Sequence, residues 1–170
     1  DPPGRGPGRS AEALARRAVR FIEAHRDRPF FAYLAPNAVH IPLTGTPERL
    51  SRYRAKPTVP GYPSLPVYGA LLEELDASVG LVLDALDRLG LTRDTLVVFT
   101  SDNGGLVREM GGWPATGNGP LRDEKGTVYE GGIRVPTLVR WPGIVPEGAV
   151  TRATAVTTDL VPTLLETARY

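Results

Sequence analysis

Two oxygen-bearing side chains, Asp102 and Asn103, follow the apolar run at residues 95–99, and a glycine pair follows them in turn. Such a run of β-prone residues predicts a buried strand. In open α/β sheets, ligands bind beyond the carboxyl ends of the strands. A carboxylate and an amide carbonyl at that place are hard-oxygen ligands that suit Ca²⁺ or Mg²⁺. The pair is therefore a candidate metal site, and an Asx-Gly turn that simply closes a strand is the alternative.

Two cationic side chains are candidates for contacting an anion. His40 follows a second apolar run and lies in a loop, where a packing role is the alternative. Lys125 is one of only two lysines beside eighteen arginines, which indicates that its position requires the compact charge of an ammonium group. A solvated loop lysine is the alternative for Lys125. The other histidine, His25, falls at the expected end of a helix, where a cation suits the helix dipole, so we interpret it as structural.

Composition narrows the class of protein. With 170 residues and 41% hydrophobic residues the chain can form one domain with a core. A net charge of +1 does not indicate a nucleic-acid partner. The chain has no cysteine, which excludes disulfides, thiolate metal sites and a cysteine nucleophile on it. No apolar run approaches the roughly 18 residues of a membrane span, and the first residues do not resemble a signal peptide.

Alternating helical and strand patterns are expected to position the candidate residues. The prediction is a flexible linker at 1–9, helices at 10–26, 67–89 and from 159 onward, and strands at 29–35, 95–100 and 135–141. The helix at 67–89 is the clearest, because its apolar residues recur at spacings of three and four. A coiled coil is the alternative for this stripe. Residues 104–126 form a long glycine-rich loop of the kind that carries function. This order predicts an α/β sandwich with a mostly parallel sheet.

Seven segments, in order along the chain, resemble the later part of a sulfatase catalytic domain. They lie at residues 29–35, 39–42, 68–80, 99–105, 118–136, 140–143 and 158–165. The resemblance implies an alkaline-phosphatase-like α/β/α sandwich and the hydrolysis of sulfate esters at one divalent cation, Ca²⁺ or Mg²⁺. Residues 10–170 are then expected to be a partial sulfatase catalytic domain, acting in the full-length enzyme on a sulfate-ester small molecule or a sulfated glycan.

The resemblance also implies roles for the candidate residues. Asp102 and Asn103 resemble two of the family's metal ligands. Lys125 resembles the lysine that grips the sulfate, and His40 resembles the histidine that contacts the sulfate and the leaving oxygen. Cations aimed at sulfuryl oxygens stabilise charge in the transition state. We therefore expect His40, Lys125 and Asp102 to converge within about 10 Å around one tetrahedral anion. Glu130 and Arg134, four residues apart, are interpreted as a structural ion pair.

The family's nucleophile has no counterpart in the chain. Sulfatases carry a formylglycine, made from cysteine or serine, in a Cys/Ser-x-Pro-x-Arg motif. The segment from Ser64 to Tyr68 starts in this way, but Tyr68 stands where arginine is required. The formylglycine is therefore expected in a missing N-terminal segment, together with further metal ligands, and a C-terminal subdomain is expected to be missing as well. The chain alone is expected to be inactive. The family implies that the protein is secreted, periplasmic or lysosomal, and we find no signal peptide in the chain.

Two other classes of function stay open. A phosphodiesterase or phosphatase of the same superfamily commonly has Asp-His-Gly where this chain has Asn103 after Asp102, because imidazole suits Zn²⁺ or Mn²⁺. Asn103 therefore disfavours a phosphodiesterase or phosphatase. A non-catalytic binding module is compatible with the missing nucleophile.

Overall fold

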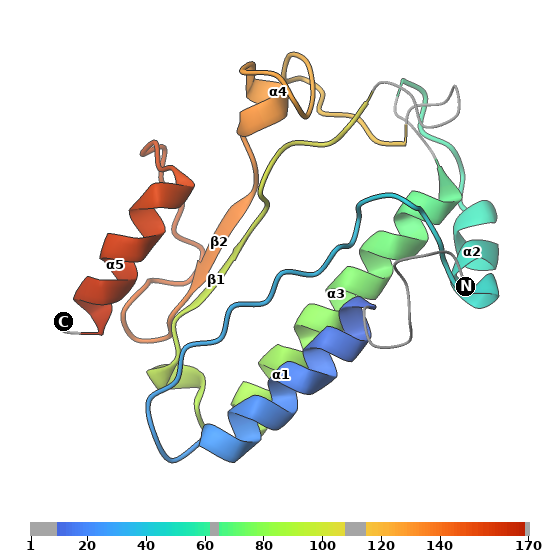
Figure 1. The fold of residues 1–170 in the computed structure, drawn as a ribbon. Coiled ribbons are helices and arrows are strands. Elements are labelled where there is room, and N and C mark those ends of the chain that lie inside the picture. The colour runs from blue at the N-terminus through green and yellow to red at the C-terminus, as the bar shows by residue number, and fades with distance from the viewer. Residues whose placement is uncertain (1–9, 62–64, 108–114, 169–170) are drawn as a thin grey trace.

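The structure is a computed structural model that describes residues 10–61, 65–107 and 115–168. Figure 1 shows the arrangement of its elements. They are α1 (Ala11–His25), α2 (Pro47–Arg54), α3 (Pro66–Arg88), η1 (Thr92–Asp94), β1 (Val97–Thr100), α4 (Glu130–Ile133), β2 (Thr137–Arg140), η2 (Thr157–Asp159) and α5 (Leu160–Thr167). The predicted linker at 1–9 and Ser64 lie outside the described residues. None of the helices in the described ranges is long and apolar enough to cross a membrane.

The core lies between the helices α1 and α3, which pack along each other (Figure 1). The buried apolar side chains of these two helices are Ala11, Ala15, Ala18, Ile22, Ala70, Leu71, Ala85 and Leu86. Small residues on both helices allow a close approach, and Ile22, Leu71 and Leu86 are the largest fully buried side chains. The helical layer is therefore the best-packed part of the chain.

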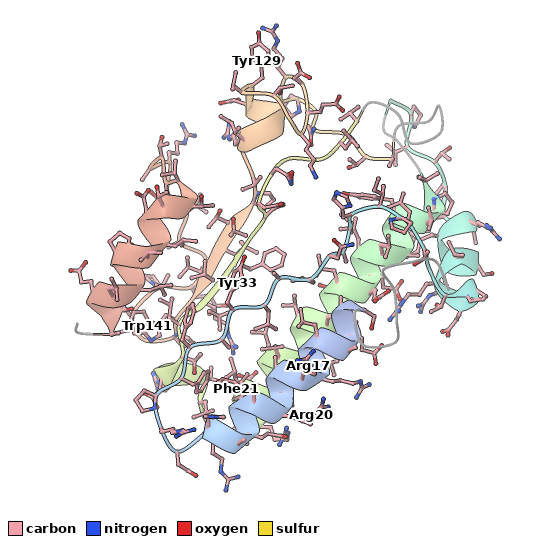
Figure 2. All side chains as sticks on the ribbon, viewed as in Figure 1. Arg17, Arg20, Phe21, Tyr33, Tyr129 and Trp141 are labelled. Carbon is pink, nitrogen blue, oxygen red and sulfur yellow. The ribbon has the colours of Figure 1, made fainter. Side chains whose placement is uncertain are left out.

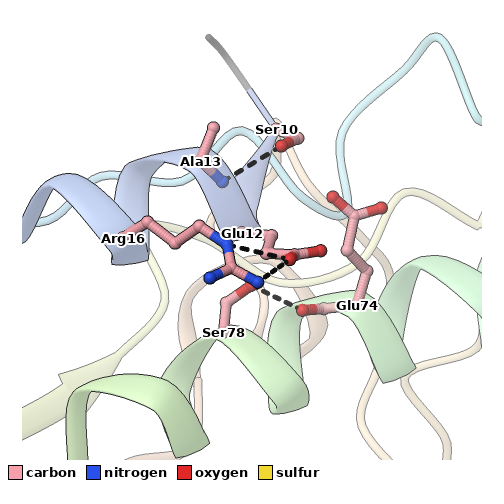
Figure 3. A network of polar contacts seen from close by, with 6 residues as sticks. All are labelled: Ser10, Glu12, Ala13, Arg16, Glu74 and Ser78. Carbon is pink, nitrogen blue, oxygen red and sulfur yellow. Dashed lines mark hydrogen bonds and ion pairs between the residues drawn. The ribbon is translucent and has the colours of Figure 1, made fainter. Parts of the chain in front are cut away.

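Local hydrogen bonds define the start of α1 and a buried polar group on α3 (Figure 3). The Ser10 side chain accepts a hydrogen bond from the Ala13 amide at 3.1 Å, as an N-cap does. One turn further on, Arg16 pairs with the Glu12 carboxylate at 2.7 Å. On α3, the buried Ser78 hydroxyl donates to the Glu74 carbonyl at 2.6 Å, so this side chain is not left unsatisfied.

The predicted helices at 10–26, 67–89 and 159 onward are confirmed, with ends that differ by one or two residues. The helix α2 was not predicted. The sequence signal for this helix is confined to its start. Thr46 caps the helix by accepting a hydrogen bond from the Arg49 amide, and Pro47 stands in the first turn. Few apolar residues follow this start, so hydrophobic periodicity does not reveal the helix.

The two strands pair differently from the prediction. β1 and β2 are antiparallel, with Val97 opposite Arg140 and Thr100 opposite Thr137, so this pair does not show the parallel pairing that was predicted for most of the sheet. The predicted strand at 29–35 forms no ladder with any described residue. It nevertheless runs as an extended segment (Figure 1) with alternating exposure, and Phe31 and Tyr33 are 71% and 82% exposed. The apolar pattern predicted the conformation, but strand pairing also needs a neighbour of matching register.

The packing of Leu86 leads to a stability prediction. Leu86 is 2% exposed, so Leu86→Ala removes buried contacts and leaves a cavity between α1 and α3. We expect it to lower the free energy of unfolding by about 2–5 kcal/mol, measured by urea denaturation of this chain. Leu72 lies on the same helix and is 45% exposed. Leu72→Ala is the matched control and should cost less than about 1 kcal/mol. Equal losses for the two variants would contradict this assignment of the core.

A polar link joins the end of α3 to β2. The Asp87 carboxylate accepts hydrogen bonds from the Thr92 hydroxyl and, at 2.8 Å, from the Arg140 guanidinium. The bond from Thr92, followed by that from Arg140, lowers the pKa of Asp87 below its ordinary value of 3.8. These contacts favour the ionised carboxylate, so their contribution to stability is fully present above the unfolded-state pKa. It is lost as the pH falls through the lower folded-state pKa.

Replacing Asp87 with asparagine should therefore have a pH-dependent effect. At pH 7, Asp87→Asn is expected to lower the midpoint of thermal unfolding, because the charge-assisted bond to Arg140 is weakened. The difference from the unmodified chain should shrink as the pH falls below 3.8. Asp76→Asn is the matched control, since Asp76 is exposed on the same helix. A difference that stays constant from pH 7 to the acid limit would contradict the role assigned to Asp87.

Candidate active site

The predicted metal ligands lie directly beyond β1. The Ser101 hydroxyl donates to the Asn103 carbonyl at 2.8 Å and holds the turn that follows the strand. The side-chain nitrogen of Asn103, Nδ2, donates a hydrogen bond to Asp102 Oδ1 at 2.6 Å, so the two side chains meet on the same side of the chain. This bond does not use Asn103 Oδ1 or Asp102 Oδ2. These two atoms are chemically suited to a hard divalent cation.

The segment that follows these residues is bound to the loop that carries Lys125. The Gly104 amide donates to the Gly132 carbonyl at 2.9 Å, and the Lys125 amide donates to the Gly105 carbonyl at 3.2 Å. Within the loop, the Gly131 amide donates to the Arg122 carbonyl at 2.7 Å. Backbone hydrogen bonds therefore place Lys125 beside the turn of Asp102 and Asn103, although Asn103 and Lys125 lie 22 positions apart along the chain.

Glycine makes this close approach possible. A Cβ atom on Gly104 would lie 1.8 Å from the Gly131 carbonyl oxygen. One on Gly131 would lie 2.0 Å from the Asp123 carbonyl oxygen, and one on Gly132 would lie 2.4 Å from that of Thr127. Real Cβ atoms do not approach backbone oxygens so closely, so these positions require glycine for reasons of space. These glycines therefore allow backbone segments to contact each other directly.

His40 lies on a different loop. It is exposed, its amide donates to the Asn37 carbonyl at 2.7 Å, and its Nδ1 lies 2.9 Å from the Ile41 carbonyl oxygen. A carbonyl can only accept, so this contact is a hydrogen bond in the tautomer with the hydrogen on Nδ1, which leaves Nε2 as the ring atom available to another group. Within the described residues His40 makes no hydrogen bond to the other three predicted site residues. Its convergence with Lys125 and Asp102 remains a prediction.

The residues interpreted as structural behave as expected. His25 ends α1, its Nδ1 lies 2.7 Å from the Phe21 carbonyl oxygen, and its ring stacks on that of Phe21, which is labelled in Figure 2. Arg134 pairs with Glu130 at 3.4 Å. A shallow pocket of about 300 Å³ is lined only by α1 and α3, by residues Arg16, Val19, Arg20, Leu81, Asp84, Ala85 and Arg88, and is not part of the polar loops.

The fit of a metal ion can be judged from the donor set. Asp102 and Asn103 offer only oxygen, as Ca²⁺ and Mg²⁺ prefer. No cluster of three or more histidine, cysteine, aspartate or glutamate side chains suited to a metal occurs in the described part of the chain. Ca²⁺ takes six to eight oxygen ligands, so the two residues can form only part of its coordination shell. The oxygen atoms of Asp102 and Asn103 would fit one hard cation if other groups completed its coordination shell.

Sequence reasoning missed two residues that join the loops. Asn118 binds Gly105 through its side chain, and Glu124 is only 6% exposed while its carboxylate accepts from the Val107 amide. Asn118 precedes Gly119 and Pro120, which is typical of a turn. Glu124 lies in a run of charged residues, which is typical of a solvated loop. Neither pattern carries a signal for a contact so distant in sequence.

Solved structures define the class of fold. The chain matches the structure of Ps i-CgsB in complex with k-i-k-neocarrahexaose with a TM-score of 0.81 and 35% identity, over 93% of this chain and 34% of that one. It matches the PsFucS1 sulfatase from Pseudoalteromonas sp. with a TM-score of 0.75 and 30% identity, over 92% of this chain and 29% of that one. The chain therefore has part of an alkaline-phosphatase-like fold of mixed helix and sheet.

Sequence comparison gives the family. The family model described as Sulfatase matches residues 1–170. The chain is 42% identical to mouse steryl-sulfatase, over 89% of this chain and 23% of the relative. It is 38% identical to a sulfatase of Formosa agariphila, over 95% of this chain and 30% of the relative. The chain belongs to the sulfatase family, as its motifs predicted, and it spans about a third or less of the length of these proteins.

Proposed function

We propose that the full-length protein hydrolyses sulfate esters, and that this chain supplies Asp102, Asn103, Lys125 and His40 to the active site. The observation that carries the proposal is the hydrogen bond from the Lys125 amide to the Gly105 carbonyl. It holds a cationic residue beside an oxygen-ligand pair at the end of a strand, where α/β proteins bind ligands. Residues 10–170 then act as a partial catalytic domain after a linker at 1–9.

The proposed roles follow from the chemistry of each group. Asp102 and Asn103 would hold one Ca²⁺ or Mg²⁺, which when bound supplies Lewis-acid polarisation of a sulfuryl oxygen. The Lys125 ammonium would stabilise negative charge that develops on the transferring group and the leaving oxygen. His40 would bind the sulfate or the leaving oxygen through Nε2, since Nδ1 already lies 2.9 Å from the Ile41 carbonyl oxygen.

The remaining parts of the enzyme are proposed to come from the rest of the full-length protein. The chain has no cysteine from which formylglycine could be made. We expect the nucleophile in an N-terminal segment and predict no sulfatase activity for this chain alone, because it has no cysteine and its segment at Ser64 lacks the arginine of the formylglycine motif. The rest of the protein would also complete an α/β/α sandwich with a mostly parallel sheet. Exposed apolar side chains such as Phe31, Tyr33 and Leu138 support this, since an isolated domain normally buries them.

For the substrate class we favour a sulfated glycan. The support is the likeness to Ps i-CgsB, which was solved with k-i-k-neocarrahexaose, at a TM-score of 0.81. A small-molecule sulfate ester is the second candidate, because the chain is 42% identical to mouse steryl-sulfatase. Turnover of a sulfated oligosaccharide and of a steryl sulfate by the full-length protein would separate the two.

The reaction class has a direct test. The full-length protein, supplied with Ca²⁺, is expected to cleave a chromogenic aryl sulfate faster than the corresponding aryl phosphate, and the chain alone should cleave neither. Preference for the phosphate would favour a phosphoesterase, and no turnover of either would favour a binding module. Turnover by the chain alone that Lys125→Ala abolishes would mean that the nucleophile is on this chain, with Ser64 as the first residue to examine.

A further inference from the structure

We propose that Asn118 is a positioning residue, whose carboxamide holds the segment after Asp102 and Asn103 against the loop that carries Lys125. This role rests on the proposed function, because it matters for activity only if these residues share one active site. It adds a residue that touches neither the metal nor the sulfate.

The carboxamide of Asn118 binds both loops at once. The Gly105 amide donates to Asn118 Oδ1 at 3.0 Å, and Asn118 Nδ2 donates to the Gly105 carbonyl at 2.8 Å. Nδ2 also donates to the Asp123 carbonyl at 3.1 Å. Gly105 is two residues after Asn103, and Asp123 is two residues before Lys125. The three bonds therefore act close to the residues that are to be aligned.

Few side chains could replace it. Paired bonds to the amide and the carbonyl of one residue need a donor and an acceptor on the same planar group, and the third bond needs a second hydrogen on the nitrogen. A carboxylate of the same shape would have no hydrogen for the Gly105 and Asp123 carbonyl oxygens. Gly105 also has to be small, because a Cβ atom there would lie 2.5 Å from Thr116 Cγ2 and 3.0 Å from Asn118 Oδ1.

The same carboxamide also holds the loop around Asp123. Asp123 has φ of 69°, in the left-handed region that aspartate tolerates better than most residues other than glycine. The Asn118 bond to its carbonyl fixes the peptide that leads toward Lys125. The Gly105 carbonyl accepts from both Asn118 Nδ2 and the Lys125 amide. Loss of the carboxamide should thus loosen Lys125 and the strand end together.

The test uses the full-length protein with the variants Asn118→Asp and Asn118→Ala, and turnover of a chromogenic aryl sulfate. Each should lower kcat/KM by about 10²-fold, mainly through kcat, because misplacing a charge-stabilising group by about 1 Å costs that much. If Asn118 acts through Lys125, the same substitution in a Lys125→Ala background should cost less than about 10-fold. Losses that multiply in the double variant would show a merely structural role and would overturn the proposal.

Hydrogen exchange gives a readout that does not depend on activity. In Asn118→Ala, amides of residues 104–107 and 123–126 should exchange faster, while those of α1 and α3 should stay as in the unmodified protein. Thr163→Ala, which removes the bond from the Thr163 hydroxyl on α5 to the Asp159 carbonyl at the end of η2, is the matched control and should change neither segment. Protection lost throughout, or failure of both Asn118 variants to fold, would assign Asn118 to global stability and overturn the proposal.

The two proposals can fail separately. If Lys125→Ala leaves turnover unchanged, the function proposed for the site is wrong, whatever Asn118 does. If Lys125→Ala lowers turnover while the Asn118 variants retain full activity and unchanged exchange at 104–107 and 123–126, the function stands and the positioning role is wrong.

Discussion

Lys125→Ala in the full-length protein is expected to lower kcat/KM for a chromogenic aryl sulfate by about 10²–10³-fold, the usual cost of removing one group that stabilises charge in the transition state. The expectation follows from the position of Lys125, whose amide binds the Gly105 carbonyl beside the turn of Asp102 and Asn103. Steady-state kinetics should show the loss mainly in kcat.

The chain offers a matched control for this substitution in its other lysine. Lys56 lies beyond the end of α2, with its ammonium nitrogen 4.4 Å from the centre of the Tyr53 ring. Lys56→Ala removes the same charge and should leave kcat/KM within about twofold. If the two lysine variants lose activity equally, the effect of Lys125 is one of net charge or stability, and its role in the site is wrong.

Gly131→Ala should have the second large effect. The added Cβ would lie 2.0 Å from the Asp123 carbonyl oxygen and 2.5 Å from that of Arg122. Backbone cannot move aside as a flexible side chain can, so the loop must shift, which is expected to lower the free energy of unfolding by about 1–3 kcal/mol. The same shift should displace Lys125 and lower kcat/KM by about 10²-fold.

Gly80→Ala is the matched control for this prediction. Gly80 lies within α3, and a Cβ there would meet nothing within 4 Å. Alanine favours a helix more than glycine does, by about 1 kcal/mol, so the control should be neutral or stabilising and should leave turnover unchanged. Thermal unfolding and turnover are to be measured for both variants. If Gly131→Ala behaved like Gly80→Ala in both measurements, the packing proposed for Gly131 would be wrong.

The helices were predictable because their signals are local. The α3 stripe and the cap at Ser10 act within a few residues, so the sequence shows them directly. Strand pairing was not predictable in the same way, since the antiparallel register of β1 and β2 joins residues about 40 positions apart. The extended segment at 29–35 shows that a strand-like pattern does not itself supply a partner.

The candidate site shows the same division. Asp102 and Asn103 stood out because they follow an apolar run, and Lys125 because lysine is rare in this chain. The contacts that align them were hidden, because the meaning of Asn118 depends on Gly105, thirteen residues earlier. Glu124 was hidden in a charged run although it is buried and bonded to Val107. Residue types and their positions in the sequence suggest which side chains can do chemistry. Which other residues hold these side chains in place depends on the three-dimensional course of the backbone.

The central claim is that Asp102 and Asn103 bind the cation of a sulfate-ester hydrolase, and calcium affinity tests it most directly. Isothermal titration of the full-length protein with Ca²⁺ would compare the unmodified protein, Asp102→Ala, and Asp94→Ala as a control. Asp94 is exposed and precedes β1, whereas Asp102 follows it. The account predicts that Asp102→Ala weakens Ca²⁺ binding by at least about 10–100-fold, as loss of a group that supports a metal site does, and that Asp94→Ala leaves it unchanged. Unchanged Ca²⁺ affinity in Asp102→Ala would contradict it.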